Sequence, residues 1–207
     1  MKERGMIFNA EMVRAILEGR KTQTRRIVKP QPEITSSGNL SGEWLSKPLN
    51  GLLLPKIEDI AIHCPFGNVG ERLWVREAFR VHSRATDVAT LVYRASERNS
   101  WTEQTRRVPV SACSKPVSPE KWTPSIHMPR YASRILLEIT DVRVEKLKNI
   151  PRDGIIAEGY PAERAADGGE CDPFLWYRDL WESLYGAGSW QANPWIWVIS
   201  FKRVEVA

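Results

Sequence analysis

Cysteine is scarce in this chain. Among its 207 residues are three cysteines, Cys64, Cys113 and Cys171, which are widely spaced and odd in number, and no pair has CxxC spacing. A disulfide framework or a structural zinc site is read from regularly spaced or paired cysteines, so the sequence predicts neither. The dipeptide His63-Cys64 stands alone. We therefore expect no bound metal and no cofactor.

Long apolar runs are missing too. No stretch approaches the roughly 18 apolar residues from which a membrane-spanning helix is predicted. The N-terminus does not have the charged and then apolar layout of a secretion signal. We expect a cytoplasmic protein without a membrane partner. Internal repeats and low-complexity tracts are absent as well.

The remaining composition is that of an ordinary globular protein with some positive charge. Thirty Lys and Arg residues stand against 25 Asp and Glu, for a net charge of +5, which favours an anionic partner, nucleic acid first. The nine tryptophans are too many for all of them to be core. They either present flat faces for base stacking or pack the core and rim of a β-rich fold.

A basic box near the N-terminus is the most informative segment. An amphipathic helix pattern ends at Gly19, a typical helix stop, and Arg20-Lys21-Thr22-Gln23-Thr24-Arg25-Arg26 follows. A turn between Lys21 and Thr24 would bring an ammonium and a hydroxyl group together, to hold a phosphate or to activate a nucleophile. The residues alone equally allow a solvated basic face beside a helix end.

Hydrophobic periodicity predicts a chain with more strands than helices. The expected strands are 6–9, 24–28, 72–79, 90–95, 133–144 and 195–204, and the expected helices are 10–18, 151–158 and 173–185. Segments rich in Ser, Gly, Asn and Pro at about 30–60, and a polar segment at about 96–125, read as loop-rich insertions outside the core. We expect one α+β domain over residues 1–207, a small mixed β-barrel with flanking helices and these two insertions.

Four segments together resemble the ASCH domain, a relative of the PUA RNA-binding domains. They are Gly19-x-Lys21-x-x-Thr24-x-Arg26, the turn and strand 69–76, the strand and helix within 139–158, and the strand 197–201. They are spread over most of the chain, and the layout is similar to that of ASCH proteins encoded by phages and prophages. The resemblance implies a PUA-like barrel with a cleft for a nucleotide or RNA.

The resemblance also implies candidate catalytic residues. The small bacterial N(4)-acetylcytidine amidohydrolases of this family use a Lys, a Thr and a Glu. Carried over by position, these are Lys21, Thr24 and Glu158, the last from the short helix after the long strand. Those enzymes are about half as long as this chain, and the insertions here can reshape or cover the cleft.

Two chemical roles are open for the three residues. Thr24 is the nucleophile if Lys21 acts as its base, which requires a lysine pKa well below the usual ~10.4; Glu158 then shuttles protons to the leaving amine. Alternatively Glu158 activates water, while Lys21 and Thr24 hold the carbonyl. A plain salt bridge between Lys21 and Glu158, with Thr24 as an ordinary strand residue, is the structural alternative.

The expected substrate-binding residues are Arg26, Trp74, Arg76 and Arg130. Arg26 offers a fork donor for a carbonyl or a phosphate. Trp74 shares a strand face with Arg76, for stacking or for packing, and Arg130 lies in a segment that mixes His, Arg and aromatic residues.

Three functions remain from the sequence. The first is hydrolysis of the N(4)-acyl amide of acylated cytidine. The second is an RNA-binding module without chemistry, and the third is cleavage of single-stranded RNA in the same cleft. The expected partner is a nucleoside or RNA in each case, and the sequence leaves the oligomeric state open.

Overall fold

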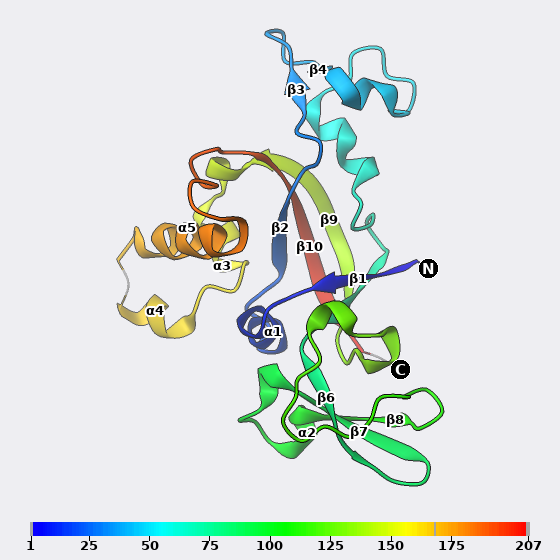
Figure 1. Cartoon of the computed structure of the whole chain (residues 1–207). Helices are drawn as coiled ribbons and strands as arrows, with labels where there is room; N and C mark the ends of the chain where they lie inside the picture. Colours follow the sequence, from blue (N-terminus) through cyan, green and yellow to red (C-terminus); the bar gives the residue numbers. More distant parts are fainter. Residues whose placement is uncertain (1, 168, 206–207) are drawn as a thin grey trace. The chain divides into compact units, whose positions relative to one another are not determined.

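A five-stranded mixed sheet is the main feature of the computed structural model, which describes residues 2–167 and 169–205 (Figure 1). Its strand order is β1-β5-β9-β10-β2. β1 pairs with β5 in parallel, whereas the pairs β5–β9 and β10–β2 are antiparallel. The strands are β1 (Glu3–Ile7), β2 (Gln23–Ile27), β5 (Arg72–Arg76), β9 (Leu136–Lys146) and β10 (Trp195–Val204). The α+β class expected from the sequence is confirmed.

A closed barrel is not found among the described residues. β1 and β2 each have one strand neighbour in the five-stranded sheet, so the sheet is open. The strand expected at 72–79 breaks after Arg76, and its second part begins a separate three-stranded sheet. That sheet has the order β6-β7-β8, with β6 (Phe79–Arg84), β7 (Val88–Tyr93) and β8 (Thr105–Pro109). These strands are therefore not part of the larger sheet.

The contacts of the chain divide it into two compact units. Unit 1 comprises Met1–Gly19, Glu71–Glu138 and Arg203–Ala207, and unit 2 comprises Arg20–Gly70 and Ile139–Lys202. The two units meet at four places along the chain. Two of these lie within β9 and β10, and the other two lie between residues 19 and 20 and between residues 70 and 71. The single domain expected from the sequence stays a prediction.

In unit 1, β1 is followed by the helix predicted at 10–18, which is observed as α1 (Ala10–Leu17). The Asn9 side chain caps it by accepting a hydrogen bond of 2.8 Å from the Met12 N–H. Gly19 follows with φ of +77°, a conformation that glycine adopts without steric cost. The predicted helix stop is confirmed, and it directs the chain into the basic box.

The three-stranded sheet gives unit 1 its core. Buried residues from all three strands and from the segment after them form one cluster: Phe79, Val81, Ala89, Leu91, Tyr93, Val108, Cys113, Met128 and Ala132. A short helix α2 (Trp101–Gln104) precedes β8. Both elements lie in the segment expected to be a loop. Only Val108 of β8 is buried, so its hydrophobic pattern was too weak to indicate a strand, and backbone pairing with β7 supports it instead.

Unit 2 packs helices against β2 and β10. The helices are α3 (Arg152–Ile156), α4 (Ala162–Asp167) and α5 (Asp172–Tyr185), and α3 and α5 lie side by side (Figure 1). A cluster of buried side chains joins α3, α5 and β10: Leu147, Ile150, Ile155, Tyr177, Trp181, Ile196 and Val198. The helices predicted at 151–158 and 173–185 and the strand at 195–204 are confirmed, while α4 was not predicted.

The first insertion contributes to the core of unit 2, contrary to expectation. It contains β3 (Glu33–Ile34) and β4 (Leu40–Ser41), and its Trp44 is only 2% exposed. The Trp44 ring meets Trp197 edge-on at 6.1 Å, and its Nε1–H donates to the Pro30 carbonyl at 3.0 Å. One indole therefore anchors a segment whose composition is that of a loop.

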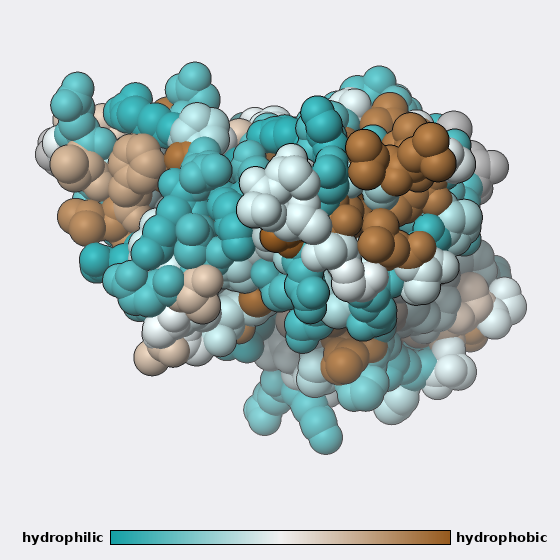
Figure 2. Space-filling model, turned by 90° about the horizontal axis from the view of Figure 1, so that it is seen from above, coloured by the Kyte–Doolittle hydropathy of each residue, from teal (hydrophilic) through white to brown (hydrophobic). Residues whose placement is uncertain are grey.

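The same insertion also exposes hydrophobic side chains. Leu53 and Leu54 are 96% and 71% exposed. The face shown in Figure 2, on which this insertion lies, carries hydrophobic patches between hydrophilic side chains. None of the described helices is long and apolar enough to cross a membrane.

Trp181 tests the core of unit 2. Its side chain is 1% exposed and its ring lies 4.3 Å from that of Tyr185. Because the cavity left by an indole collapses only in part, we expect Trp181→Ala to lower the free energy of unfolding by about 3–5 kcal/mol in chemical denaturation. Leu175→Ala on the same helix, at a side chain 47% exposed, should change it by no more than about 0.5 kcal/mol. Equal losses in the two variants would contradict this packing.

Candidate functional site

The basic box lies against the turn that follows α3, within unit 2. Lys21 forms a β-bridge with Glu158, and the N–H groups of Thr22 and Gln23 both donate to the Ala157 carbonyl, at 2.8 and 2.9 Å. Arg20 Nη1 donates to the Gly159 carbonyl at 2.8 Å. These backbone contacts join two segments far apart in the sequence and bring Lys21 to Glu158, as the resemblance implied.

A buried ionic network occupies this junction. Lys21 Nζ donates to the Glu158 carboxylate and, at 2.9 Å, to the Glu158 carbonyl. Arg25 Nη1 donates to the other carboxylate oxygen of Glu158 at 3.3 Å, and Arg25 Nε to Glu145 Oε1 at 3.1 Å. The side chains of Lys21 and Arg25 are 0% exposed and that of Glu158 is 3% exposed. Lys21, Arg25 and Glu158 are thus paired in a buried setting, and the partly exposed Glu145 links this group to Arg143.

A glycine makes room for the network. The carbonyl of Gly154, in α3, accepts from Arg25 Nη1 at 3.1 Å. A Cβ at this position would lie 2.6 Å from Arg25 Nη2, closer than a real contact allows. The guanidinium therefore occupies space that any other residue at 154 would fill.

Burial is the main influence on the pKa of Lys21. Loss of hydration lowers the pKa of this lysine from its usual value, and the nearby charges of Arg26 and Arg25 lower it further. The Glu158 carboxylate acts in the opposite direction but does not cancel the effect of burial. Lys21 is thus a lysine that releases its proton more readily than an exposed one.

Thr24 is buried, and its hydroxyl has no hydrogen-bond partner among the described residues. It pairs with Ile199 across β2 and β10. Side chains alternate along a strand, so Thr24 faces the opposite side of β2 from Arg25. Because Thr22 and Gln23 share one acceptor, the alternation is interrupted between Lys21 and Thr24. The structure thus joins Lys21 to Glu158 directly and leaves the Thr24 hydroxyl unpaired nearby in the chain.

The four expected substrate-binding residues are divided between the units. Arg26 belongs to β2 in unit 2, where its Nη1 donates to the Arg25 carbonyl at 3.3 Å. Trp74, Arg76 and Arg130 belong to unit 1. The Arg76 guanidinium lies 5.3 Å from the Trp74 ring centre, and Arg130 Nε donates to Glu3 at 2.7 Å. Their binding roles stay predictions.

Sequence reasoning missed part of both ionic networks. The sequence marks Arg25 only as one cation of the basic box, and it gives no signal for Glu145 beyond a position at the end of the long strand. In unit 1, buried Glu77 accepts from Arg134 Nε at 2.9 Å and from Arg134 Nη2 at 3.0 Å. Burial raises the pKa of Glu77, and Arg134 opposes that rise. The available signal is the alternation of the segment, in which Glu77 falls in step with Leu73 and Val75, both buried.

Metal ligands are not clustered in the part of the chain that the structure describes. No group of three or more His, Cys, Asp or Glu residues there could hold a metal ion. Cys64 and Cys113 are buried free thiols, and Cys171 is exposed.

Comparison with known proteins gives a likeness of fold. No family model matches the chain, and no curated protein matches it. Among solved structures it is similar to an ASCH domain from Lactobacillus crispatus JV V101, at 12% sequence identity and a TM-score of 0.40; the match covers 98% of this chain and 79% of that one. This is a structural similarity at low identity, and no activity or site follows from it.

Loss of Glu158 and loss of Lys21 should lower the free energy of unfolding by different amounts, which mutation can test. Glu158→Gln leaves two buried cations without their shared anion, so we expect a loss of about 3–5 kcal/mol in the free energy of unfolding. Lys21→Met removes one buried charge and leaves Glu158 with Arg25, so its loss should be smaller. In the double variant, Glu158→Gln should cost less than it does alone.

The exposed Glu163→Gln is the matched control for this denaturation cycle, with little expected effect. If Glu158→Gln were as mild as this control, or if the two substitutions were additive, the pair would not be coupled in the way described.

The lowered pKa of Lys21 predicts a pH dependence of stability. Between that lowered pKa and the value of 10.5 expected in the unfolded chain, the unfolded state binds more protons than the folded state. The free energy of unfolding should therefore rise with pH in this window, by at most about 1.4 kcal/mol per pH unit. We expect wild type to gain stability relative to Lys21→Met as pH rises towards 10.5 in denaturation series; a constant difference would refute the lowered pKa. The raised pKa values of Tyr93 and Tyr177 act in the opposite direction in both proteins and cancel in the difference.

Proposed function

We propose that this protein is an amidohydrolase that removes the acyl group from N(4)-acylated cytidine, using Lys21, Thr24 and Glu158. The observation that carries the proposal is the buried Lys21–Glu158 pair, whose lysine has a lowered pKa, close in the chain to a buried hydroxyl without a hydrogen-bond partner. A base and a nucleophile in need of a partner are the parts that acyl transfer requires. The choice of substrate comes from the sequence resemblance.

The lowered pKa favours the version in which Thr24 attacks. In its unprotonated form, which the lowered pKa makes easier to reach, Lys21 takes the hydroxyl proton as Thr24 Oγ1 bonds to the acyl carbon. The C–N bond breaks as the cytidine amine receives a proton through the Lys21–Glu158 pair. Water then attacks the acyl-threonine ester, which releases the carboxylic acid and restores the hydroxyl. The positive charge of Arg25 beside Glu158 keeps this pair held in place during both steps.

Burial sets a condition on this chemistry. Lys21, Thr24 and Glu158 are 2%, 0% and 4% exposed. A substrate therefore reaches them only after a local rearrangement of the surrounding segments. The small size of an acetyl group keeps the required opening modest, and release of product is then a natural candidate for the slow step.

Turnover of N(4)-acetylcytidine tests the proposal. We expect purified protein to convert it to cytidine and acetate, with the conversion measured by chromatography. Lys21→Met should lose at least about 100-fold in kcat, because proton transfer by a positioned group contributes that much or more. Thr24→Val, which keeps the shape but not the hydroxyl, should lose at least as much.

Lys148→Met serves as the control, because Lys148 is an exposed lysine of the same unit. It should retain wild-type turnover. Full activity in Lys21→Met and Thr24→Val, each shown to be folded by circular dichroism, would remove the hydrolytic role. Absence of turnover by folded wild type would leave the two other functions, RNA binding without chemistry and RNA strand cleavage, which an RNA gel separates.

A further inference from the structure

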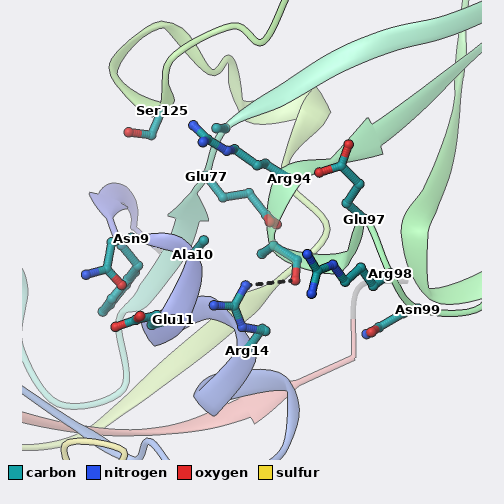
Figure 3. A pocket seen from close by; sticks show the side chains of 13 residues that line it. Asn9, Ala10, Glu11, Arg14, Glu77, Arg94, Glu97, Arg98, Asn99 and Ser125 are labelled. Carbon is teal, nitrogen blue, oxygen red and sulfur yellow. Dashed lines mark hydrogen bonds between the residues drawn. The ribbon is translucent and has the colours of Figure 1, made fainter. Parts of the chain in front are cut away.

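A large polar hollow lies within unit 1, apart from the residues of the Lys21 network. It has a volume of about 1000 Å³ and is lined from the start of α1, from residues 77–78 and from residues 94–99 (Figure 3). Arg14, Arg94 and Arg98 all line it. In Figure 3 Arg94 extends towards Ser125. Arg14 Nη1 donates to the Ala95 carbonyl at 3.5 Å.

Two smaller hollows share lining residues with the first. One, of about 430 Å³, shares Arg14 and Asn99 with it and adds Arg134 and Arg203. The other, of about 120 Å³, shares Glu97. We call the three together the arginine groove. The first hollow alone, at about 1000 Å³, lies at the upper end of the ~300–1,000 Å³ of a typical small-molecule site, which favours an extended ligand.

Aromatic rings line the smallest hollow. Trp101, Trp122 and His82 contribute to it. Trp101 is 52% exposed and meets His82 edge-on at 5.0 Å. The Arg80 guanidinium lies 5.1 Å from the Trp122 ring centre. An exposed indole next to a guanidinium-lined channel is the combination that stacks a base and holds its phosphates.

The acidic residues of the groove do not cancel this pattern. Glu77 is engaged by both nitrogens of the Arg134 fork, so its charge is compensated. Glu11, Glu18 and Glu97 are exposed and also line the groove. Carboxylates repel phosphate but accept hydrogen bonds from amino groups of bases. A ligand that carries both phosphates and base edges fits this mixture better than a simple anion does.

We propose that the arginine groove of unit 1 binds single-stranded nucleic acid, with Arg14, Arg94 and Arg98 along the phosphates and a base against Trp101. A single strand is required because its bases are free to stack on side chains. Much of the groove is built from the second insertion, whose purpose the sequence left open. The inference does not depend on hydrolysis at Lys21.

Fluorescence anisotropy with a 3′-fluorescein oligouridine of ten nucleotides tests the groove. We expect binding at low salt, weakened about fivefold or more in Trp101→Ala and restored in Trp101→Phe, because base stacking needs a flat ring. Arg98→Ala should weaken binding and reduce the slope of log affinity against log salt by about 0.7, the value for one lost phosphate contact. Thermal unfolding checks that each variant is folded.

Arg178→Ala, at an exposed arginine on α5 in unit 2, is the matched control and should bind as wild type does. Unchanged affinity in both Trp101→Ala and Arg98→Ala would overturn the groove, as would equal affinity for a duplex of the same length. The readout is binding of unacetylated RNA. Protein that binds through the groove but leaves N(4)-acetylcytidine intact would support this inference and defeat the proposed hydrolysis, and the reverse result would do the opposite.

Discussion

The segments of unit 2 are arranged around one interaction, the pairing of the buried Glu158 carboxylate with Lys21 and Arg25. The network connects the segment after α1, the strand β2 and the turn after α3, and Glu145 brings in β9. Burying the charges of Lys21, Arg25 and Glu158 is unfavourable unless each one is paired and hydrogen-bonded. That condition makes the positions of these segments interdependent, because a shift in any of them would leave a charge without its partner. Burial of the Lys21 ammonium, and not its pairing with Glu158, lowers the pKa of Lys21, and the proposed hydrolysis depends on this lowered pKa.

Local patterns predicted the elements well where periodicity and stop signals agreed. The helix ending before Gly19, the strand at 195–204 and the amphipathic helix α5 were all recognisable, because burial of one face leaves a regular hydrophobic repeat. Short elements without such a repeat were not, as α4 and β8 show. Sheet closure was also out of reach, because the break after Arg76 depends on which strands pair and not on the composition of residues 72–79.

The candidate site was partly accessible from the sequence. The resemblance assigned Lys21 and Glu158 to one site, and the two are in contact although 137 positions separate them; their catalytic role stays a prediction. Arg25 and Glu145 were not foreseen, since a charged residue in a strand is read by default as solvent-facing. Only the three-dimensional pairing shows that Arg25 is buried and that its charge is compensated by Glu158 and by the partly exposed Glu145. Glu77 and Arg134 repeat the lesson in unit 1, where an arginine fork holds a buried carboxylate beside the hollow.

Gly154 leaves the space that the Arg25 guanidinium occupies next to α3. Its missing side chain lets the Arg25 guanidinium rest against the backbone of α3, four residues before the carboxylate that the same guanidinium contacts. The Arg25 guanidinium, which belongs to β2, therefore contacts both the backbone of α3 and the Glu158 carboxylate, and it fixes how far each of them lies from β2. A methyl group at 154 would act as a wedge that displaces the guanidinium from the helix. The proton affinity of Lys21 is thus linked, through Arg25 and Glu158, to the width of a gap at a residue that bears no charge.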